Sequence, residues 1–209
     1  VRRRRKLQAR LAIKTFLDAG PGGAAGRGGV VTEAAFGEGE LPTLRTAADG
    51  TGQATFDTPD GLALWSPANP ALHDVVVSAE TDGVSDRIGL RTVRVEGSRI
   101  LLNGEPIFLA GISLHDEAIG AEPHRIATAE EAREVLGHAQ ALGCNFVRLA
   151  HYQHNEHTVR ACDELGLMAW CEIPVYWNIA WENPETAAAA STSPAAGNTP
   201  SHCRHGPYL

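Results

Sequence analysis

The stretch CNFVRLAHYQHNEHTVRACDELGLMAWCEIP, residues 144–174, decides the fold because its hydrophobic pattern changes period twice. NFVRLAH has the composition of a buried strand, NEHTVRACDELG that of a capped helix ending at Gly166, and LMAWCEIP that of a second buried strand. Two near-continuous apolar strands joined by a helix are typical of a parallel β/α unit.

The residues before this stretch repeat the pattern. TAEEAREVLGHAQALG, residues 128–143, predicts a helix with Thr128 as N-cap, acids in its first turn and Gly143 at its end. One apolar face of that helix should hold Ala132, Val135, Leu136, Ala139 and Leu142. RILLNGEPIFLAGIS, residues 99–113, predicts a hairpin around its Asn-Gly turn. The sequence thus predicts three parallel strands, at Ile107–Ile112, Asn145–His151 and Leu167–Ile173.

The first ninety or so residues indicate β structure. LQARLAIKTFLD, GQATFDT and HDVVVSAE have strand composition, while GPGGAAGRGG, residues 20–29, is typical of a turn region. Two prolines forbid a helix in LALWSPANPAL, residues 62–72, where a buried Trp65 can anchor a bend. We therefore expect an immunoglobulin-like β-sandwich at residues 1–94, incomplete at its N-terminus.

The C-terminal region departs from the β/α rhythm. WENPETAAAA predicts a helix start with Asn183 as cap, but residues 186–209 are low-complexity and rich in Ala, Ser, Thr and Pro. We expect residues 95–185 to be the N-terminal part of a TIM (β/α)8 barrel and residues 186–209 to be a disordered or frameshifted tail. Three parallel strands leave open edges, so the chain reads as cut off within a domain. The predicted fold class is β plus α/β, a sandwich followed by an incomplete barrel.

Composition excludes several classes of protein. The chain has 25 acidic and 18 basic residues and a net charge of -7, so we expect no nucleic-acid partner; RRRRK at residues 2–6 reads as a solvated tail. No run approaches the roughly 18 apolar residues of a membrane span, and Arg10 and Lys14 interrupt the candidate signal peptide. Four cysteines without C-x-x-C spacing leave the compartment open, with the cytoplasm favoured.

Polar groups follow all three predicted strands. The first strand leads to His115, Asp116 and Glu117, the second carries Arg148, His151 and Tyr152 at its end, and the third leads to Glu172. In parallel β/α folds, functional groups collect at the C-terminal ends of strands. The alternative is that these side chains are ordinary loop polars.

The histidines His151, His154 and His157 are spaced by three residues, which raises the possibility of a metal site. A zinc site would need all three on one regular element with a suitable fourth ligand. The predicted strand-to-helix break between them spoils that geometry. His151 therefore belongs with the strand end, and the other two are interpreted as solvent-facing or packing groups.

At this point the sequence resembles a known family, glycoside hydrolase family 2, which includes β-galactosidases and β-glucuronidases. The landmarks of that family occur in order between Gln53 and Asn183, in the segments LWSPANPAL, DRIGLRTVRV, ILLNGEPIFLAGISLHDE and GCNFVRLAHYQHNEHTVRACDELGLMAWCEIP. The most specific piece, N-x-x-R-x-x-H-Y followed by D-x-x-G, is carried by Asn145, Arg148, His151, Tyr152, Asp163 and Gly166. Gln153 stands where the family usually has proline.

The resemblance implies a retaining β-glycosidase, whose two catalytic carboxyl groups lie about 5–5.5 Å apart. In the family, these glutamates follow the fourth and the seventh barrel strands, so both positions are absent here. The resemblance implies that His115 and His151 bind sugar hydroxyls, with Tyr152 beside them, while Arg148 lies beneath the site. Glu172 matches a strand-end carboxylate that reaches a magnesium ion in some galactosidases. Trp170 and Trp177 could flank a sugar ring, although a Trp in an apolar strand is more often core.

Three hypotheses follow. The leading one is a fragment that resembles a β-glycosidase of carbohydrate metabolism and is inactive as it stands, with a β-glycoside or oligosaccharide as partner, no cofactor, no metal and a homo-oligomeric full-length form. The second is a non-catalytic carbohydrate-binding or interaction module. The third, and least favoured, is a metal-binding domain built on the three histidines.

Overall fold

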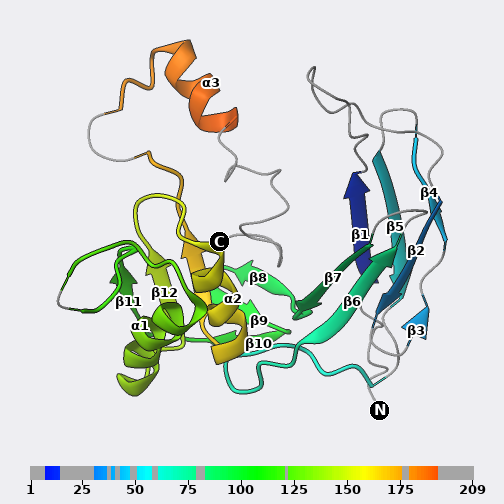
Figure 1. The fold of residues 1–209 in the computed structure, drawn as a ribbon, viewed down its shortest axis with the longest axis horizontal. Helices are drawn as coiled ribbons and strands as arrows, with labels where there is room; N and C mark the ends of the chain where they lie inside the picture. The colour runs from blue at the N-terminus through cyan, green and yellow to red at the C-terminus, as the bar shows by residue number, and fades with distance from the viewer. Residues whose placement is uncertain are drawn as a thin grey trace. The chain divides into compact units, whose positions relative to one another are not determined.

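The computed structural model describes residues 8–14, 31–36, 39–40, 43–47, 51–57, 61–78, 83–120, 122–175 and 179–192. The chain forms two compact units (Figure 1). Unit 1 comprises Val1–Ala63 and His73–Ile88, and unit 2 comprises Leu64–Leu72 and Gly89–Leu209. Among the described helices, none is long and apolar enough to cross a bilayer.

Unit 1 contains only strands in its described part, arranged in two antiparallel groups. In the first, β1 (Gln8–Lys14) pairs with β5 (Thr51–Asp57). The second has the order β3 (Gly39–Glu40), β2 (Val31–Phe36), β6 (His73–Ser78) and β7 (Gly83–Ile88), with β4 (Leu44–Arg45) also paired to β2. The strands expected in LQARLAIKTFLD, GQATFDT and HDVVVSAE are confirmed. The immunoglobulin-like sandwich stays a prediction, and the glycine-rich turn at residues 20–29 lies outside the described residues.

The first strands of unit 2 form an antiparallel meander of β8 (Val93–Glu96), β9 (Arg99–Leu102) and β10 (Glu105–Ile107). The turn between β9 and β10 is formed by Asn103 and Gly104, both with positive φ, of 54° and 88°. A two-residue turn with both central residues left-handed matches the twist of the flanking strands. The hairpin predicted from the Asn-Gly pair is confirmed.

A parallel sheet follows, ordered β11 (Gly111–Leu114), β12 (Phe146–Leu149) and β13 (Met168–Cys171). The helices α1 (Ala129–Ala141) and α2 (Glu156–Leu165) connect these strands and pack against one face of the sheet (Figure 1). The core between the sheet and the helices includes Leu136, Val147, Leu149, Ala161 and Leu167, all less than 4% exposed. The β/α alternation read from the sequence is confirmed.

The first parallel strand was expected at residues 107–112, and that expectation is wrong in its bounds. Ile107 ends β10, and β11 begins only at Gly111. Between them, Asn145 holds the chain: its Oδ1 accepts from the Ala110 N–H, and its Nδ2 donates to the Phe108 carbonyl, both at 2.9 Å. These bonds turn the chain from the meander into the parallel sheet.

Both helix starts follow their predicted caps. Thr128 accepts from the Glu131 N–H and Glu131 reaches back to the Thr128 N–H, forming a capping box. Asn155 caps α2 by accepting from the His157 N–H at 2.9 Å. The predicted apolar face of α1 is wrong at Leu142, which is 71% exposed because it is the C-cap residue, beyond the last helical turn.

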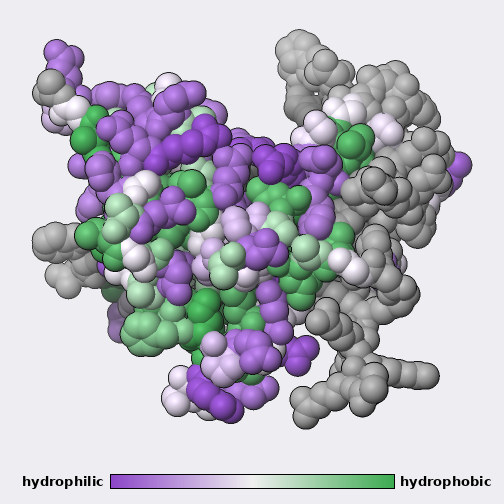
Figure 2. Space-filling view, turned by 90° about the horizontal axis from the view of Figure 1, so that it is seen from below, coloured by the Kyte–Doolittle hydropathy of each residue, from purple (hydrophilic) through white to green (hydrophobic). Residues whose placement is uncertain are grey.

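A second core lies on the opposite face of the parallel sheet. Trp65, which is fully buried, packs there with Leu102 and Met168, so the segment Leu64–Leu72 belongs to unit 2. Figure 2 shows that the hydrophobic residues on one face of the molecule form patches interrupted by hydrophilic ones.

The last described element is α3 (Pro184–Thr192), which begins after Asn183, as predicted. The Asn183 Oδ1 accepts from the Glu185 N–H at 2.9 Å. The helix therefore extends past residue 186, where the low-complexity tail was expected to begin. Residues 193–209 lie outside the described residues.

Candidate functional site

The site lies at the C-terminal end of the parallel sheet, on the face away from α1 and α2. Ser113, Arg148 and Trp170 occupy one register across the three strands. Side chains alternate along a strand, so these three residues lie on the same face of the sheet as Phe146 and Met168. The intervening residues of each strand, such as Val147 and Ala169, point into the core on the helix side. Glu172, two residues after Trp170, returns to the same face.

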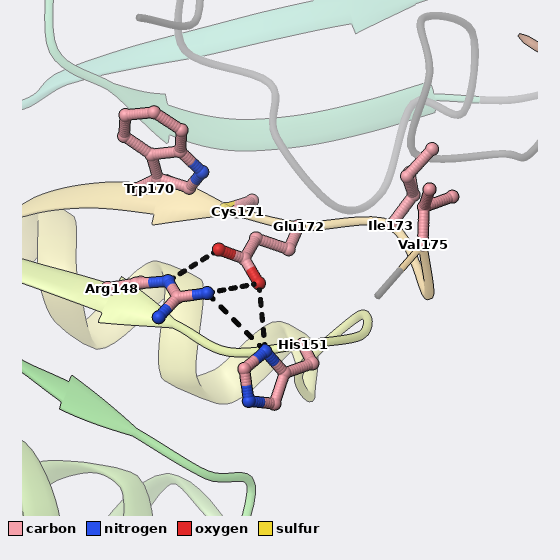
Figure 3. Close-up of a pocket in the computed structure, with 7 residues that line it drawn as sticks. All are labelled: Arg148, His151, Trp170, Cys171, Glu172, Ile173 and Val175. Carbon is pink, nitrogen blue, oxygen red and sulfur yellow. Dashed lines mark hydrogen bonds and ion pairs between the residues drawn. The ribbon is translucent and has the colours of Figure 1, made fainter. Parts of the chain in front are cut away.

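Arg148, His151 and Glu172 form one charged cluster (Figure 3). The Arg148 Nε donates to Glu172 Oε1 at 2.5 Å, and Nη2 donates to Oε2 at 3.2 Å. His151 Nδ1 lies 3.3 Å from Glu172 Oε2 and 3.4 Å from Arg148 Nη2. The hydrogen bond to Glu172 raises the pKa of Arg148, which keeps the guanidinium charged. The structure thus brings three of the five predicted site residues together.

His151 presents its second nitrogen away from the ion pair. In Figure 3 the dashed lines meet only Nδ1, and the other ring nitrogen points to the opposite side. A neutral imidazole has one donor and one acceptor, so Nδ1–H donation to Glu172 would leave Nε2 as an acceptor.

A pocket of about 520 Å³ opens at this cluster. This volume lies in the range of small-molecule sites, roughly 300–1,000 Å³. Its lining residues are Arg148, His151, Trp170, Cys171, Glu172, Ile173 and Val175. Trp170 is 45% exposed, so its ring is available to the pocket and is not core. Trp177 lies outside the described residues, and Glu172 is the single carboxylate among the lining residues.

The two other predicted site residues lie beside the pocket. The His115 ring meets the His151 ring edge-on, with centroids 5.4 Å apart and planes at 71°. Tyr152 lies 6.3 Å from His115 and stacks on His154 at 5.5 Å. His115 therefore contacts the lining residue His151, Tyr152 contacts His115, and neither of the two lines the pocket.

The three histidines of the 151–157 segment have separate surroundings. His151 lines the pocket, His154 is 4% exposed with its Nε2 2.7 Å from the Ala150 carbonyl oxygen, and His157 is exposed on α2. Burial lowers the pKa of His154, although the Ala150 carbonyl acts in the other direction. His154 is a packing group. Within the described ranges, no cluster of three His, Cys, Asp or Glu side chains could hold a metal ion.

Sequence reasoning missed Arg125 and underrated Asp116. Asp116 is 1% exposed and accepts from Arg125 Nε at 2.9 Å and Nη2 at 2.6 Å. Arg125 lies in the irregular β11–α1 loop, where periodicity gives no signal. The D-x-x-G aspartate, Asp163, also lies away from the pocket: its carbonyl accepts from Trp65 Nε1 at 2.8 Å.

His124 and Glu131 attach the same loop to α1. His124 Nε2 is 2.8 Å from Glu131 Oε1, and Nδ1 is 3.0 Å from the Glu122 carbonyl oxygen. Both ring nitrogens of a histidine can donate hydrogen bonds only when the ring is protonated to the imidazolium. The Glu122 carbonyl, followed by the Glu131 carboxylate, raises the pKa of His124. The Ala127 N–H and then His124 lower the pKa of Glu131 to about 2.

The His124–Glu131 contact should make stability depend on pH. The folded-state pKa of His124 lies above the unfolded value of about 6.5, so its stabilisation is complete below that value and disappears as pH rises through the folded pKa. The Tm difference between wild type and His124→Gln should therefore be larger at about pH 5.5 than at about pH 8.5. Thermal unfolding followed by circular dichroism measures both.

The control for this prediction is the same substitution in a Glu131→Gln background. Removal of the carboxylate should shrink the pH dependence that His124 contributes, leaving only the part due to Glu122. A Tm difference that is equal at both pH values, or larger at the alkaline one, would contradict the role of the contact.

The fold and the site together define a class of protein. Functional side chains at the C-terminal ends of parallel strands are found in TIM barrels and in other parallel β/α proteins. Residues 93–202 match the family model described as "Glycosyl hydrolases family 2, TIM barrel domain", which covers just over half of the chain. The chain therefore belongs to glycosyl hydrolase family 2.

Curated relatives carry the names of two activities. The chain is 32% identical over 107 residues to a β-galactosidase of Arthrobacter sp. (strain B7), and 31% identical over 145 residues to the human β-glucuronidase. These alignments cover 51% and 62% of this chain, but only 10% and 22% of those proteins. The chain thus spans about a fifth or less of the length of these relatives.

Solved structures agree on the fold. The galacturonate-bound GH2 β-galacturonidase from Eisenbergiella tayi aligns with a TM-score of 0.65 at 22% identity, over 80% of this chain and 29% of that one. At this identity, the likeness concerns the fold alone. The apo structure of Bacteroides uniformis β-glucuronidase 3 aligns with a TM-score of 0.56 at 30% identity, over 80% and 21% of the two chains.

Proposed function

We propose that these residues form the supporting wall of a sugar site in a retaining β-glycosidase of the galactosidase or glucuronidase type. The observation that carries the proposal is the Arg148–Glu172–His151 cluster, which stands at the strand ends and lines the pocket. An ion-paired carboxylate, a charged guanidinium and an imidazole together offer donors and acceptors to vicinal hydroxyls. The half-exposed Trp170 adds an aromatic face beside them.

The division of roles follows from the contacts. The short two-point contact with Arg148 fixes the plane of the Glu172 carboxylate, so its oxygens accept from sugar O–H groups in one direction. His151 receives its orientation from Glu172 on one side and from the edge-on His115 ring on the other. We assign Arg148 to holding the carboxylate, and His151 and Glu172 to the substrate.

We also propose that the 209 residues alone bind β-glycosides without turning them over. A retaining mechanism needs two carboxyl groups about 5–5.5 Å apart, one as nucleophile and one as acid/base. Glu172 is the single carboxylate among the lining residues of the described pocket, and Arg148 already donates to both of its oxygens.

The test is a titration of the isotopically labelled chain with D-galactose and with D-glucuronate, followed by NMR. Signals of Arg148, His151 and Trp170 should shift with one or both sugars. Glu172→Gln should weaken the binding about tenfold, because hydrogen bonds to a charged group are among the stronger ones. The matched control is Glu156→Gln, which removes a carboxylate from the exposed pair with Arg160 and should leave the affinity unchanged.

Two results would contradict the proposal. If neither sugar moves the pocket signals at concentrations where free monosaccharides saturate weak sites, the cluster is not a sugar wall. If the wild-type chain releases nitrophenol from aryl β-glycosides and Glu172→Gln abolishes that release, Glu172 is a catalytic acid or nucleophile and not a supporting residue.

A further inference from the structure

A second ion pair lies next to the pocket, and the proposed function does not use it. Asp116 follows β11, is 1% exposed, and holds Arg125 of the same loop through two donors, Nε at 2.9 Å and Nη2 at 2.6 Å. A buried carboxylate is retained only when it is paired and hydrogen-bonded. The Arg125 side chain is 68% exposed, so it lies between the Asp116 carboxylate and the solvent.

The same pair also binds the neighbouring loop, which follows β12. The other Asp116 oxygen, Oδ1, accepts from the Asn155 N–H at 3.3 Å. The Arg125 Nη2 donates to the Gln153 carbonyl at 3.3 Å. One ion pair therefore ties two loops together at two backbone positions, on either side of His154.

Arg125 lies at the end of a row of rings that leads to the pocket. Its guanidinium carbon is 5.3 Å from the centroid of the Tyr152 ring. Tyr152 is 6.3 Å from His115, and His115 is 5.4 Å from His151. The Tyr152 hydroxyl adds a long contact, accepting from the Asp116 N–H at 3.4 Å. The contacts therefore run from Asp116 and Arg125 through the Tyr152 and His115 rings to His151.

We propose that Asp116 and Arg125 are positioning residues, which clamp the Tyr152 and His115 rings and thereby fix the direction in which His151 meets the substrate. The substrate part of this proposal rests on the proposed function. An imidazole that is held at one nitrogen by Glu172 can still tilt about that contact. The edge-on His115 ring limits the tilt, and the clamp fixes that ring through Tyr152.

The clamp uses the geometry of both residues. Both Arg125 donors reach the same oxygen, Oδ2, while Oδ1 accepts from the Asn155 N–H, and asparagine of the same size would present an N–H₂ group to one of these contacts. Lysine in place of Arg125 would keep the charge but lose the planar fork and its stacking on Tyr152. Asp116→Asn and Arg125→Lys should therefore have the same effect.

The first part of the experiment needs no sugar. In NMR spectra of the full chain, the wild type should show nuclear Overhauser contacts between the His115 and His151 rings, and ring-current shifts of the Arg125 side-chain protons over Tyr152. Both signatures should be lost in Asp116→Asn and in Arg125→Lys, while the contacts of Trp65 with Met168 in the core remain. Variants that keep the wild-type ring contacts would overturn the clamp.

The second part measures sugar affinity at a temperature where each variant is fully folded. Both clamp variants should bind D-galactose or D-glucuronate about tenfold more weakly than the wild type, a loss near 1.4 kcal/mol. The matched control is Glu164→Gln, which breaks the Arg133–Glu164 pair between α1 and α2 and should leave affinity unchanged. Unchanged affinity in clamp variants that have lost their ring contacts would overturn the positioning role. A wild type that binds neither sugar contradicts the proposed function instead, and the ring contacts still decide on the clamp.

Discussion

Replacing Trp65 with alanine should destabilise unit 2 by about 3–5 kcal/mol, the usual loss for a large aromatic side chain in a core. Trp65 is fully buried against Leu102 and Met168, and its Nε1 donates to the Asp163 carbonyl at 2.8 Å. The Arg91 guanidinium carbon lies 4.8 Å from the ring centroid. The substitution would therefore open a cavity, remove a buried donor and uncover an arginine whose pKa is already lowered by burial.

Hydrogen exchange at the Met168 N–H, which donates to the Asn145 carbonyl at 2.9 Å, reports the opening of unit 2 specifically. Trp65→Phe keeps an aromatic ring but loses the indole N–H, and should cost about 1–3 kcal/mol. Trp181→Ala removes a ring that is 58% exposed and should change stability by no more than about 0.5 kcal/mol. If Trp65→Ala cost no more than Trp181→Ala, Trp65 would not be the centre of this core.

Gly166→Ala should destabilise the same unit by about 2–4 kcal/mol, for two reasons that add. Gly166 ends α2 with a φ of 73°, a left-handed conformation that alanine adopts at a cost. A Cβ at this position would also lie 2.6 Å from the Pro67 carbonyl oxygen, a backbone atom that cannot turn aside. The helix end and the segment that carries Trp65 would have to move apart.

The chain offers a matched control at the end of the other helix. Gly143 has a φ of 78°, but a Cβ added there would meet nothing within 4 Å. Gly143→Ala should therefore carry only the conformational cost, about 1–2 kcal/mol. Urea unfolding of the two variants separates the effects, and equal losses of unfolding free energy would show that the close approach to Pro67 does not matter.

The sequence predicts the fold where the hydrophobic residues recur with a regular period and where capping and turn residues mark the ends of the elements. Thr128, Asn155 and the Asn103–Gly104 turn each carry local chemistry that specifies a cap or a turn, and each lies where it was expected. The run at residues 107–112 is apolar without a period, so nothing local says where one strand stops and the next begins. Asn145 decides it from 35 and 37 residues away.

The candidate site likewise contains residues that the sequence predicts and residues that it does not. Arg148, His151 and Glu172 could be placed because strand ends in a parallel sheet converge, and that rule needs only the strand positions. Arg125 could not, because its place depends on the path of an irregular loop that brings it back over Tyr152. Trp170 shows the limit of composition: an apolar strand suggests burial, yet alternation turns this one ring toward the pocket.

The interleaving of the two units along the chain has a consequence for biosynthesis. Trp65 leaves the ribosome well before its hydrogen-bond partner Asp163, which lies 98 residues later in the chain. At translation rates of about 5–20 residues per second, this tryptophan waits roughly 5–20 s before the helix that supplies its hydrogen-bond acceptor has been made. During that interval β6 and β7, which belong to unit 1, are synthesised and can pair with each other. Until 98 further residues have been added, the indole N–H of the nascent chain therefore lacks the acceptor that it has in the folded protein.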